Sequence, residues 1–429
     1  MEHDLILPAV LAAMEAAGAD ASQASLSLSA KTELNIDAGK LSLLRTTESC
    51  RLGLTAYVGG RKGSLGLNRL DEASVKAAAG EVVALARLSP PDEANAIAPA
   101  APARFEEYGE ATPDLAAMYD RFKEFLDWEG KALPKTRLEQ CSLEHLGSRW
   151  FFANSNGVDL RDRTALYHFG GMFTTKDGAK SSSFNYSGGA ARSLDKPLKD
   201  WGSMERLMRQ SAEQLSPGTV EGKFTGELLI TPDCLEDFIG SLNGQYLGDG
   251  CLIKGSSPFK SRLGQVVASP RLTLRSAPRS LAAGRFYTPD GFIAEDCALI
   301  EKGVLKQFNL SHYGARKTSL PKSPNMGGLW VVDPGTETFE ELLAKVGRGL
   351  LLCRFSGGSP SENGDFQGVA KNSYLIEKGR LVGPVNETMV SGNIGSLFRD
   401  ISGISRERID FGMAVLPWVL TSGAVISGK

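Results

Sequence analysis

The chain has 429 residues, and its 48 lysines and arginines nearly balance 50 aspartates and glutamates, for a formal net charge of −2. This balance excludes the strongly basic surface typical of general nucleic-acid binders and of polybasic membrane-surface proteins. With 42% hydrophobic and 23% charged residues, the composition is that of a soluble globular protein of two or three domains. The 48 glycines indicate many tight turns, and hence many strands and hairpins.

No segment is typical of an export signal or a membrane span. The start, Met1 to Asp4, is acidic where a signal peptide is basic, and the apolar run from Leu5 to Met14 is too short to cross a bilayer. The six cysteines include no Cys-x-x-Cys pair, and a chain of this size needs no disulfide bonds. We therefore expect a cytoplasmic protein with reduced thiols and no membrane or nucleic-acid partner.

Residues 1–104 predict an N-terminal α+β domain. Apolar spacing over residues 5–17 indicates a helix, and the strict alternation from Ala24 to Ser29 indicates a half-buried strand. Further strands with a hairpin turn at Gly59-Gly60 follow, and then a second helix capped by Asp71. This order of elements is typical of an α+β fold.

The middle of the chain predicts a linker and a second domain. The stretch 90–104 is rich in proline and alanine, which favours an exposed surface linker. Residues 105–222 predict a central α+β domain, with a helix over 113–130, strands from 140 to 186 and a second helix over 202–215.

Residues 223–429 predict a strand-rich C-terminal domain. A short buried strand from Gly226 to Ile230 leads into Thr231-Pro232, a cap followed by proline at the first helical position. One apolar helix face follows, made by Leu235, Phe238, Ile239, Leu242 and Tyr246. Beyond Gly250 the chain is rich in glycine, serine and proline and carries few helical periods. The whole chain is therefore predicted as α+β, with antiparallel or mixed sheets.

The residues alone predict no metal site. The chain has four histidines, at positions 3, 145, 168 and 312, and none pairs with another at helical spacing. His3 lies at the terminus, while His145 and His168 stand in strand-like context, which favours a structural role. His312 follows an apolar strand and is a candidate for lining a functional cleft.

The residues alone do not predict covalent catalysis either. Cys251 and Cys353 lie in glycine-rich surroundings, but free cysteine is usually buried and inert. The sequence contains neither a Gly-x-Ser-x-Gly motif nor a phosphate-binding loop. The stretch from Gly244 to Gly250 follows a helix rather than a strand, so it predicts a helix end instead of a nucleotide site. We predict no catalytic residue in this chain.

Ten short segments carry strand and turn signatures in a characteristic order. They are Gly59–Gly63, Asn154–Val158 with Thr164, Ser257–Lys260, Leu263–Val267, Asp290-Gly291, Leu299–Leu305, Gly364–Phe366, Ile376–Gly379, Gly383–Val385 and Gly392–Ile394. Together they span nearly the whole chain. In order and spacing they resemble the TldD/PmbA family of bacterial and archaeal metalloprotease subunits, whose members are also called modulators of DNA gyrase.

The family has two branches, and the resemblance implies one of them. The TldD branch carries a His-Glu-x-x-x-His zinc motif on the helix after the first strand of the C-terminal domain, and a zinc-binding cysteine later in the chain. That helix here contains Ile239, Gly240, Ser241, Asn243 and Gln245, and Ser356 stands where the cysteine is expected. The resemblance therefore implies the TldE/PmbA-like branch, with no cofactor in this chain and zinc in a partner subunit.

That branch implies a non-catalytic subunit that forms a heterodimer with a TldD-like, zinc-bearing partner. The complex would degrade or process unfolded peptides and small proteins, read by backbone pairing to a strand edge near Gly357 to Phe366. Two alternatives stay open. One is a stand-alone peptide-binding homodimer without protease activity, and the other is a thiol hydrolase in which Cys251 or Cys353 works with His312.

Three further residues are candidates for a cleft or a partner surface: Phe259, His312 and Asp365. Phe259 is chosen because Ser257-Pro258-Phe259 places an aromatic ring in a glycine- and serine-rich loop beside the helix without the zinc motif. An equally open interpretation is that the Phe259 ring packs in the core of its own chain.

Overall fold

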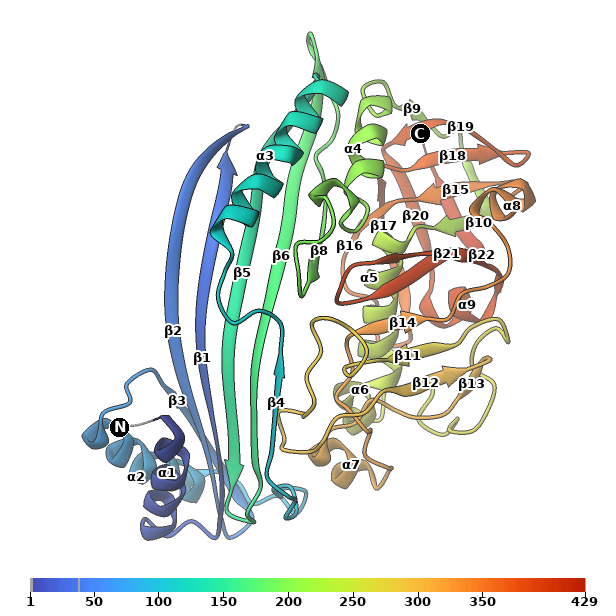
Figure 1. Cartoon of the computed structure of the whole chain (residues 1–429). Coiled ribbons are helices and arrows are strands. Elements are labelled where there is room, and N and C mark those ends of the chain that lie inside the picture. Colours follow the sequence, from blue (N-terminus) through green and yellow to red (C-terminus); the bar gives the residue numbers. More distant parts are fainter. Residues whose placement is uncertain (1–2, 38, 429) are drawn as a thin grey trace.

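A computed structural model describes residues 3–37 and 39–428 of the chain. A long curved sheet built from the N-terminal half stands beside a compact body of shorter strands and helices built from the C-terminal half (Figure 1). The predicted α+β class, with a strand-rich C-terminal domain, is confirmed. No helix within the described residues is long and apolar enough to cross a membrane.

The N-terminal half contains α1 (His3–Ala16), β1 (Ala21–Asp37), β2 (Lys40–Val58), β3 (Arg61–Leu67), α2 (Glu72–Leu88), β4 (Arg104–Tyr108), α3 (Leu115–Ala132), β5 (Thr136–Asn154), β6 (Asp159–Asp177), β7 (Lys180–Ser181), β8 (Asn185–Ala191) and α4 (Met204–Glu213). The C-terminal half begins with β9 (Gly218–Thr219), β10 (Lys223–Ile230), α5 (Pro232–Leu242), a π-helical turn (Asn243–Leu247), α6 (Asp249–Lys254), β11 (Leu274–Ser276), β12 (Cys297–Glu301), β13 (Val304–Leu305), α7 (His312–Thr318) and β14 (Trp330–Val332). It ends with α8 (Phe339–Lys345), β15 (Arg348–Leu352), β16 (Arg354–Gly357), β17 (Asp365–Lys371), β18 (Tyr374–Glu377), β19 (Arg380–Asn386), β20 (Thr388–Asn393), α9 (Ile394–Arg399), β21 (Ile401–Asp410) and β22 (Val415–Ser427).

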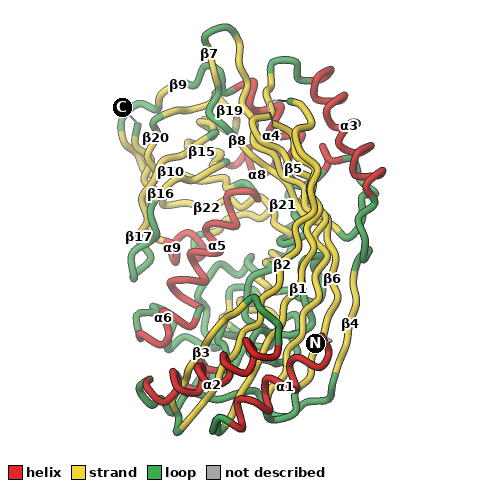
Figure 2. Tube along the Cα trace, turned by 90° about the vertical axis from the view of Figure 1, so that its left-hand side faces the viewer, coloured by secondary structure: helices red, strands yellow, loops and turns green. Residues whose placement is uncertain are grey.

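The long sheet has the strand order β3-β2-β1-β5-β6-β4, and β7 and β8 also pair with β6. Helices α1 and α2 cover one end of the sheet and α3 covers the other (Figures 1 and 2). This cover explains the alternating pattern of β1, because Leu26 packs into the core with α1 and α2 whereas Leu34 packs into the core with α3. The alternation predicted from residue 24 holds near the start of the strand but breaks in its middle, where Leu28 is half-buried, Ala30 is exposed and Glu33 is buried.

Strands on both sides of residue 104 belong to this one sheet. β4 begins at Arg104 and pairs in parallel with β6, while β1 pairs with β5 in an antiparallel register from Gln23–Asn154 to Asp37–Gln140. Segments 1–104 and 105–222 thus share a sheet through strands that lie far apart in sequence. Local periodicity does not reveal such pairing, because it reports only which face of each strand is buried.

The prediction of an exposed linker over 90–104 is wrong for its middle part. Ala94, Ile97 and Ala98 are buried. Ala98 packs in a cluster with side chains of β5, β6 and the loop before β12. The backbone carbonyls of Glu93 and Ala94 accept hydrogen bonds from the Arg316 guanidinium of α7. The small alanine side chains let this segment lie flat between the two halves of the molecule, where it joins them.

The C-terminal sheet is built around β10. Its main strand order is β13-β12-β11-β14-β22-β10-β15-β18-β19-β9, and β21 and β20 branch from β22, with β17 and β16 continuing beyond β20. β10 pairs antiparallel with β22 and parallel with β15. Buried side chains from these strands and from α5 form the largest core of the chain.

Helix α5 leaves the end of β10 as the sequence predicts. Pro232 is its first residue, and Thr231 has the extended backbone of an N-cap. The Thr231 hydroxyl does not cap the helix, however, because it donates to the Cys353 carbonyl at 3.3 Å. The predicted apolar face is buried, while Asp237 and Gly240 on the opposite face are exposed. α5 therefore presents one polar face to the outside of the core.

A buried ion pair joins the two halves of the molecule. The Arg285 Nε donates to the Asp162 carboxylate on β6 at 2.8 Å, and the Asp162 side chain is fully buried. The guanidinium lies between two aromatic rings, 4.3 Å from the Trp150 centroid and 4.5 Å from the Tyr287 centroid. Burial raises the pKa of Asp162, and the nearby arginine only partly offsets this effect.

We expect Arg285→Met to lower the free energy of unfolding by about 3–5 kcal/mol, because it leaves a buried carboxylate without its cation. Adding Asp162→Asn to that variant should recover most of the loss. The control is Glu107→Gln, which breaks the exposed Arg163–Glu107 pair and should cost less than about 1 kcal/mol. Urea unfolding measures all of these variants, and equal losses for Arg285→Met and Glu107→Gln would contradict the role of the buried pair.

Candidate functional site

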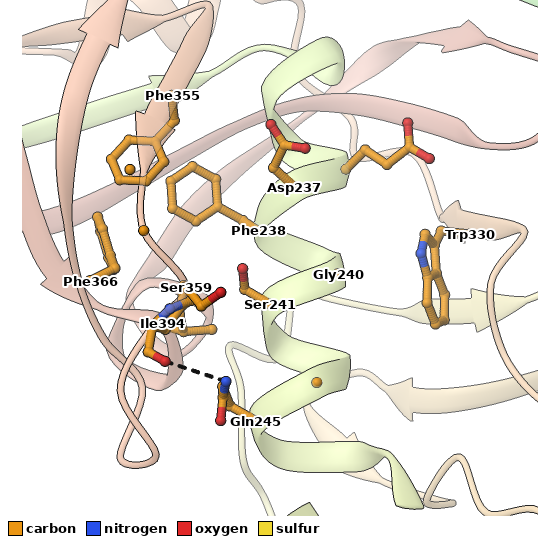
Figure 3. Close-up of a pocket in the computed structure, with 15 residues that line it drawn as sticks. Asp237, Phe238, Gly240, Ser241, Gln245, Trp330, Phe355, Ser359, Phe366 and Ile394 are labelled. Carbon is orange, nitrogen blue, oxygen red and sulfur yellow. Dashed lines mark hydrogen bonds between the residues drawn. The ribbon is translucent and has the colours of Figure 1, made fainter. Parts of the chain in front are cut away.

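A cleft of about 660 Å³ opens over the polar face of α5 (Figure 3). α5 and the π-helical turn contribute its floor, β16 and the segment after it contribute one wall, and β14, β17 and α9 contribute single side chains. The lining residues are Glu236, Asp237, Phe238, Gly240, Ser241, Gly244, Gln245, Trp330, Phe355, Gly357, Gly358, Ser359, Pro360, Phe366 and Ile394. Its volume exceeds that of four other cavities in the molecule, which measure about 580, 360, 360 and 130 Å³.

Three aromatic rings form an apolar wall of this cleft. The Phe238 ring on α5 lies 5.5 Å from the Phe355 ring on β16 and 5.4 Å from the Phe366 ring on β17, measured between centroids. Phe355 and Phe366 are themselves 5.5 Å apart in an edge-to-face arrangement. Figure 3 shows the three rings grouped on the same side of α5. Such mutual packing holds each ring in place, and half-buried Phe355 supplies most of the apolar surface because Phe238 and Phe366 are buried.

The second wall is bare backbone. Within the described residues β16 pairs with β17 along one edge, and Gly357 and Gly358 at its end are exposed. A Cβ atom on Gly357 would lie 2.6 Å from the Gln367 carbonyl oxygen, so this position requires glycine. The Gln245 side-chain amide donates to the Pro360 carbonyl at 3.3 Å and ties the loop to the helix (Figure 3). The cleft therefore offers peptide groups to a ligand.

Two carboxylates lie in the middle of α5, about one turn before Gly240 and Ser241. Glu236 is half-buried and Asp237 is more exposed, and neither makes a hydrogen bond or ion pair within the described part of the chain. Burial is the main reason that the pKa of each is raised, and the charge of Arg354 partly opposes the effect. The cleft thus carries negative charge that the described residues compensate only in part.

The structure brings together part of the predicted motif region. Gly240, Ser241 and Gln245 line the cleft, whereas Ile239 is fully buried in the core on the other side of α5. Asn243 accepts a hydrogen bond from Asn309 at 2.9 Å and stands outside the lining. Ser356 is exposed on β16 but does not line the cleft, since Phe355 and Gly357 on either side of it do.

The interpretation of Phe259 as a partner surface is wrong. Its ring is buried, 4.7 Å from the Tyr246 ring between centroids, because the loop folds back onto the π-helical turn. His312 begins α7 and lies outside the lining, with its amide donating to Asp290 and its ring 5.1 Å from another aromatic ring. Asp365 is exposed at the start of β17, next to the cleft, where it accepts a hydrogen bond from Asn393.

The other histidines and the two cysteines do not form a reactive site. His145 is buried and its Nε2 lies 2.8 Å from the Glu110 carbonyl, which confirms its structural role. His168 is half-buried, and burial lowers its pKa. Cys251 and Cys353 are buried, which raises the pKa of both thiols, that of Cys353 to about 12. At neutral pH these thiols are protonated and poor nucleophiles.

The sequence reasoning missed both carboxylates and the aromatic wall. A signal for the carboxylates was present in the sequence. Residues 236, 240 and 244 follow one another at four-residue spacing, on the helix face opposite the apolar one. No comparable signal marked the rings at 355 and 366, which reach the cleft from β16 and β17 through sheet pairing.

The lining residues do not fit a zinc ion. Zinc in proteins is bound by about three or four cysteine, histidine or carboxylate side chains arranged around one point. At the centre of the cleft stand Gly240, Ser241 and Gln245, which offer a hydroxyl and an amide. Within residues 3–37 and 39–428 no three histidine, cysteine or acidic residues gather closely enough to hold a metal ion.

Comparison with known protein families places the C-terminal half in a known class. Residues 223–428 match the family described as the PmbA/TldA metallopeptidase C-terminal domain. The chain is 24% identical to the metalloprotease PmbA of Escherichia coli O157:H7 over 452 aligned residues, which cover 98% of this chain and 97% of PmbA.

Two solved structures share the fold along the whole chain. TldE from Thermococcus kodakarensis superposes with a TM-score of 0.82 at 17% identity, covering 98% of this chain and 99% of TldE. A Bacteroides thetaiotaomicron protein proposed as a modulator of DNA gyrase superposes with a TM-score of 0.85 at 21% identity, covering 100% of this chain and 99% of that protein. The C-terminal half is thus a metallopeptidase-family domain. Residues 223–428 belong to this C-terminal domain family, and the whole chain is similar to PmbA, as the resemblance implied.

The unpaired carboxylates predict a pH-dependent stability change. The Glu236→Gln, Asp237→Asn double variant should melt at a higher temperature than the parent chain at pH 7.5. With pKa values raised in the folded state, the unfolded chain loses these protons first as pH rises, so deprotonation favours unfolding. The gain should vanish below about pH 4, where both states are protonated.

The matched control is Glu81→Gln, Asp120→Asn, which makes the same charge change at exposed sites on α2 and α3. Its melting temperature should stay within error of the parent at both pH values. A Glu236→Gln, Asp237→Asn variant that is less stable than the parent at pH 7.5 would show that these carboxylates have favourable partners.

Proposed function

We propose that this chain is the non-catalytic, TldE/PmbA-like subunit of a heterodimeric zinc metalloprotease of the TldD/TldE type. The supporting observation is the polar face of α5. This helix follows the first long strand of the C-terminal domain, where the TldD branch carries its zinc motif. Here that face holds glycine, serine and glutamine around a cleft. Hydrolysis through zinc-bound water needs metal ligands and a carboxylate base, which the centre of this cleft does not supply.

The substrates we propose are unfolded peptides and small proteins. Exposed peptide groups at Gly357 and Gly358 can pair with an extended chain without reading its sequence. The aromatic wall beside them can bind apolar side chains, which folded proteins keep buried. The zinc belongs to the TldD-like partner, and the two chains together would enclose substrate between them. This chain would then bind and orient substrate and complete the enclosure.

We propose a cytoplasmic site of action for this complex. All six cysteines are free thiols, as expected in a reducing compartment. The stand-alone peptide-binding homodimer is the alternative, and the same cleft would serve it. The two proposals differ in whether a zinc-bearing partner is needed, and the experiments below separate them.

The purified chain alone should bind no stoichiometric zinc and cleave no peptide. Metal analysis after dialysis and a casein or short-peptide assay are the measurements. One tightly bound zinc per chain, together with cleavage that a chelator stops, would refute the non-catalytic role.

Co-expression with a TldD-like chain should give a stable complex on size exclusion that cleaves peptides. In that complex Cys251→Ala, Cys353→Ala and His312→Ala should each leave activity within a few-fold of the parent, since catalytic acid–base groups contribute about 10²–10⁴-fold. Replacing a histidine of the partner's zinc motif is the positive control and should abolish cleavage. An inactive Cys or His variant that still assembles would make this chain catalytic, and failure to assemble would favour the homodimer.

A further inference from the structure

We propose that the cleft over α5 selects extended peptides that carry a lysine or arginine side chain within two residues of an apolar one. This inference rests on the proposed function, because it names the substrate class of the same cleft. Its basis is the combination of three features in one cavity: unpaired carboxylates, an aromatic wall and a free strand edge.

The negative charge of the cleft is only partly compensated by the described residues of the chain. Among the described lining residues Glu236 and Asp237 are acidic, and none is a lysine or arginine. Arg354 is the cation whose charge reaches both carboxylates, but its guanidinium stacks 3.8 Å over the Tyr186 ring. It also lies 3.9 Å from the buried Asp233 carboxylate. Arg354 is thus committed to the junction with the long sheet, and a cationic ligand is the complement that the cleft lacks.

The apolar wall lies directly beside this charge. Asp237 and Phe238 are consecutive on α5, and the Phe238 ring meets Phe355 and Phe366. Figure 3 shows Asp237 one turn above Ser241, with the three rings alongside. In an extended chain, residues i and i+2 point to the same side and lie about 6–7 Å apart, so a cation at the carboxylates and an apolar side chain at the rings belong to positions i and i+2 of one peptide.

The strand edge gives the peptide its direction. β16 runs from Arg354 to Gly357 along the cleft, and the exposed Gly358 that follows has open space where a side chain would lie. Backbone pairing supplies affinity that is independent of sequence, and the side-chain contacts supply selectivity. The ring wall would take Leu, Ile, Val or Phe, and the carboxylates would take Lys or Arg.

The ammonium group of a peptide N-terminus has the same chemistry as a lysine side chain. Probes blocked at both ends separate the two sources. We would use a fluorescein-labelled, N-acetylated and C-amidated nonapeptide of glycine and serine with Leu at position 6 and either Lys or norleucine at position 4. A third probe carries norleucine and a free N-terminus. Norleucine keeps the length of the lysine stem and removes the charge.

Fluorescence anisotropy should be measured with the full chain, alone and in complex with a TldD-like partner whose zinc motif is inactivated. We expect the Lys probe to bind about ten-fold more tightly than the norleucine probe at low salt, with the difference shrinking at high salt. The Glu236→Gln, Asp237→Asn variant should bind both blocked probes equally, within about two-fold. The charge-matched control Glu81→Gln, Asp120→Asn should keep the ten-fold preference.

Each other outcome overturns the inference in a distinct way. Equal binding of the Lys and norleucine probes by the parent chain rules out charge selection and leaves the proposed function standing. Tighter binding of the free-terminus probe than of the blocked Lys probe assigns the carboxylates to the peptide terminus. If none of the probes binds either the chain or the complex, both the inference and the peptide-binding part of the proposed function fail.

Discussion

The parallel pairing of β10 with β15 is the constraint on which the cleft depends. The two strands run side by side from Glu227–Gly349 to Ile230–Leu352. A Cβ atom on Gly349 would lie 2.1 Å from the Glu227 carbonyl oxygen, so this close approach requires glycine. At their carboxyl ends the Thr231 amide donates to the Leu352 carbonyl at 3.1 Å. After these ends β10 continues into α5 and β15 continues into β16, and the cleft is the space between α5 and β16. Ligand sites in sheets commonly form at the carboxyl ends of parallel strands for this reason.

Acidic side chains have different surroundings at two places in the molecule. Where the halves meet, Asp162 is fully buried and receives Arg285, which two aromatic rings hold in place. At the cleft Glu236 is half-buried and Asp237 more exposed, and the charge of Arg354 only partly opposes the raised pKa of each. The first arrangement positions the long sheet against the C-terminal half. The second lowers stability, and proteins usually keep such a local conflict where a ligand resolves it.

The proposed division of labour follows from what the α5 scaffold keeps and what it lacks. A strand edge, an aromatic wall and a helix floor can bind an extended chain through contacts that need no metal. Glycine, serine and glutamine at the centre of the floor cannot lower the pKa of a bound water as a zinc site does. Binding and hydrolysis would therefore reside in different subunits, which restricts cleavage to chains that reach both.

The sequence by itself determined the elements whose signals are local. The proline-led start and the apolar face of α5 follow from residue spacing, as does the alternation at the start of β1. The order of motifs along the chain indicated the family to which the C-terminal domain belongs. Tertiary structure alone decided that β1 and β5 share a sheet and that Phe259 belongs to the core. It likewise decided that Ala94, Ile97 and Ala98 are buried between the halves. It also decided that Phe355 and Phe366 meet Phe238 beside two unpaired carboxylates. These outcomes depend on pairings between distant segments, and the identity of a residue does not reveal which distant backbone will lie beside it.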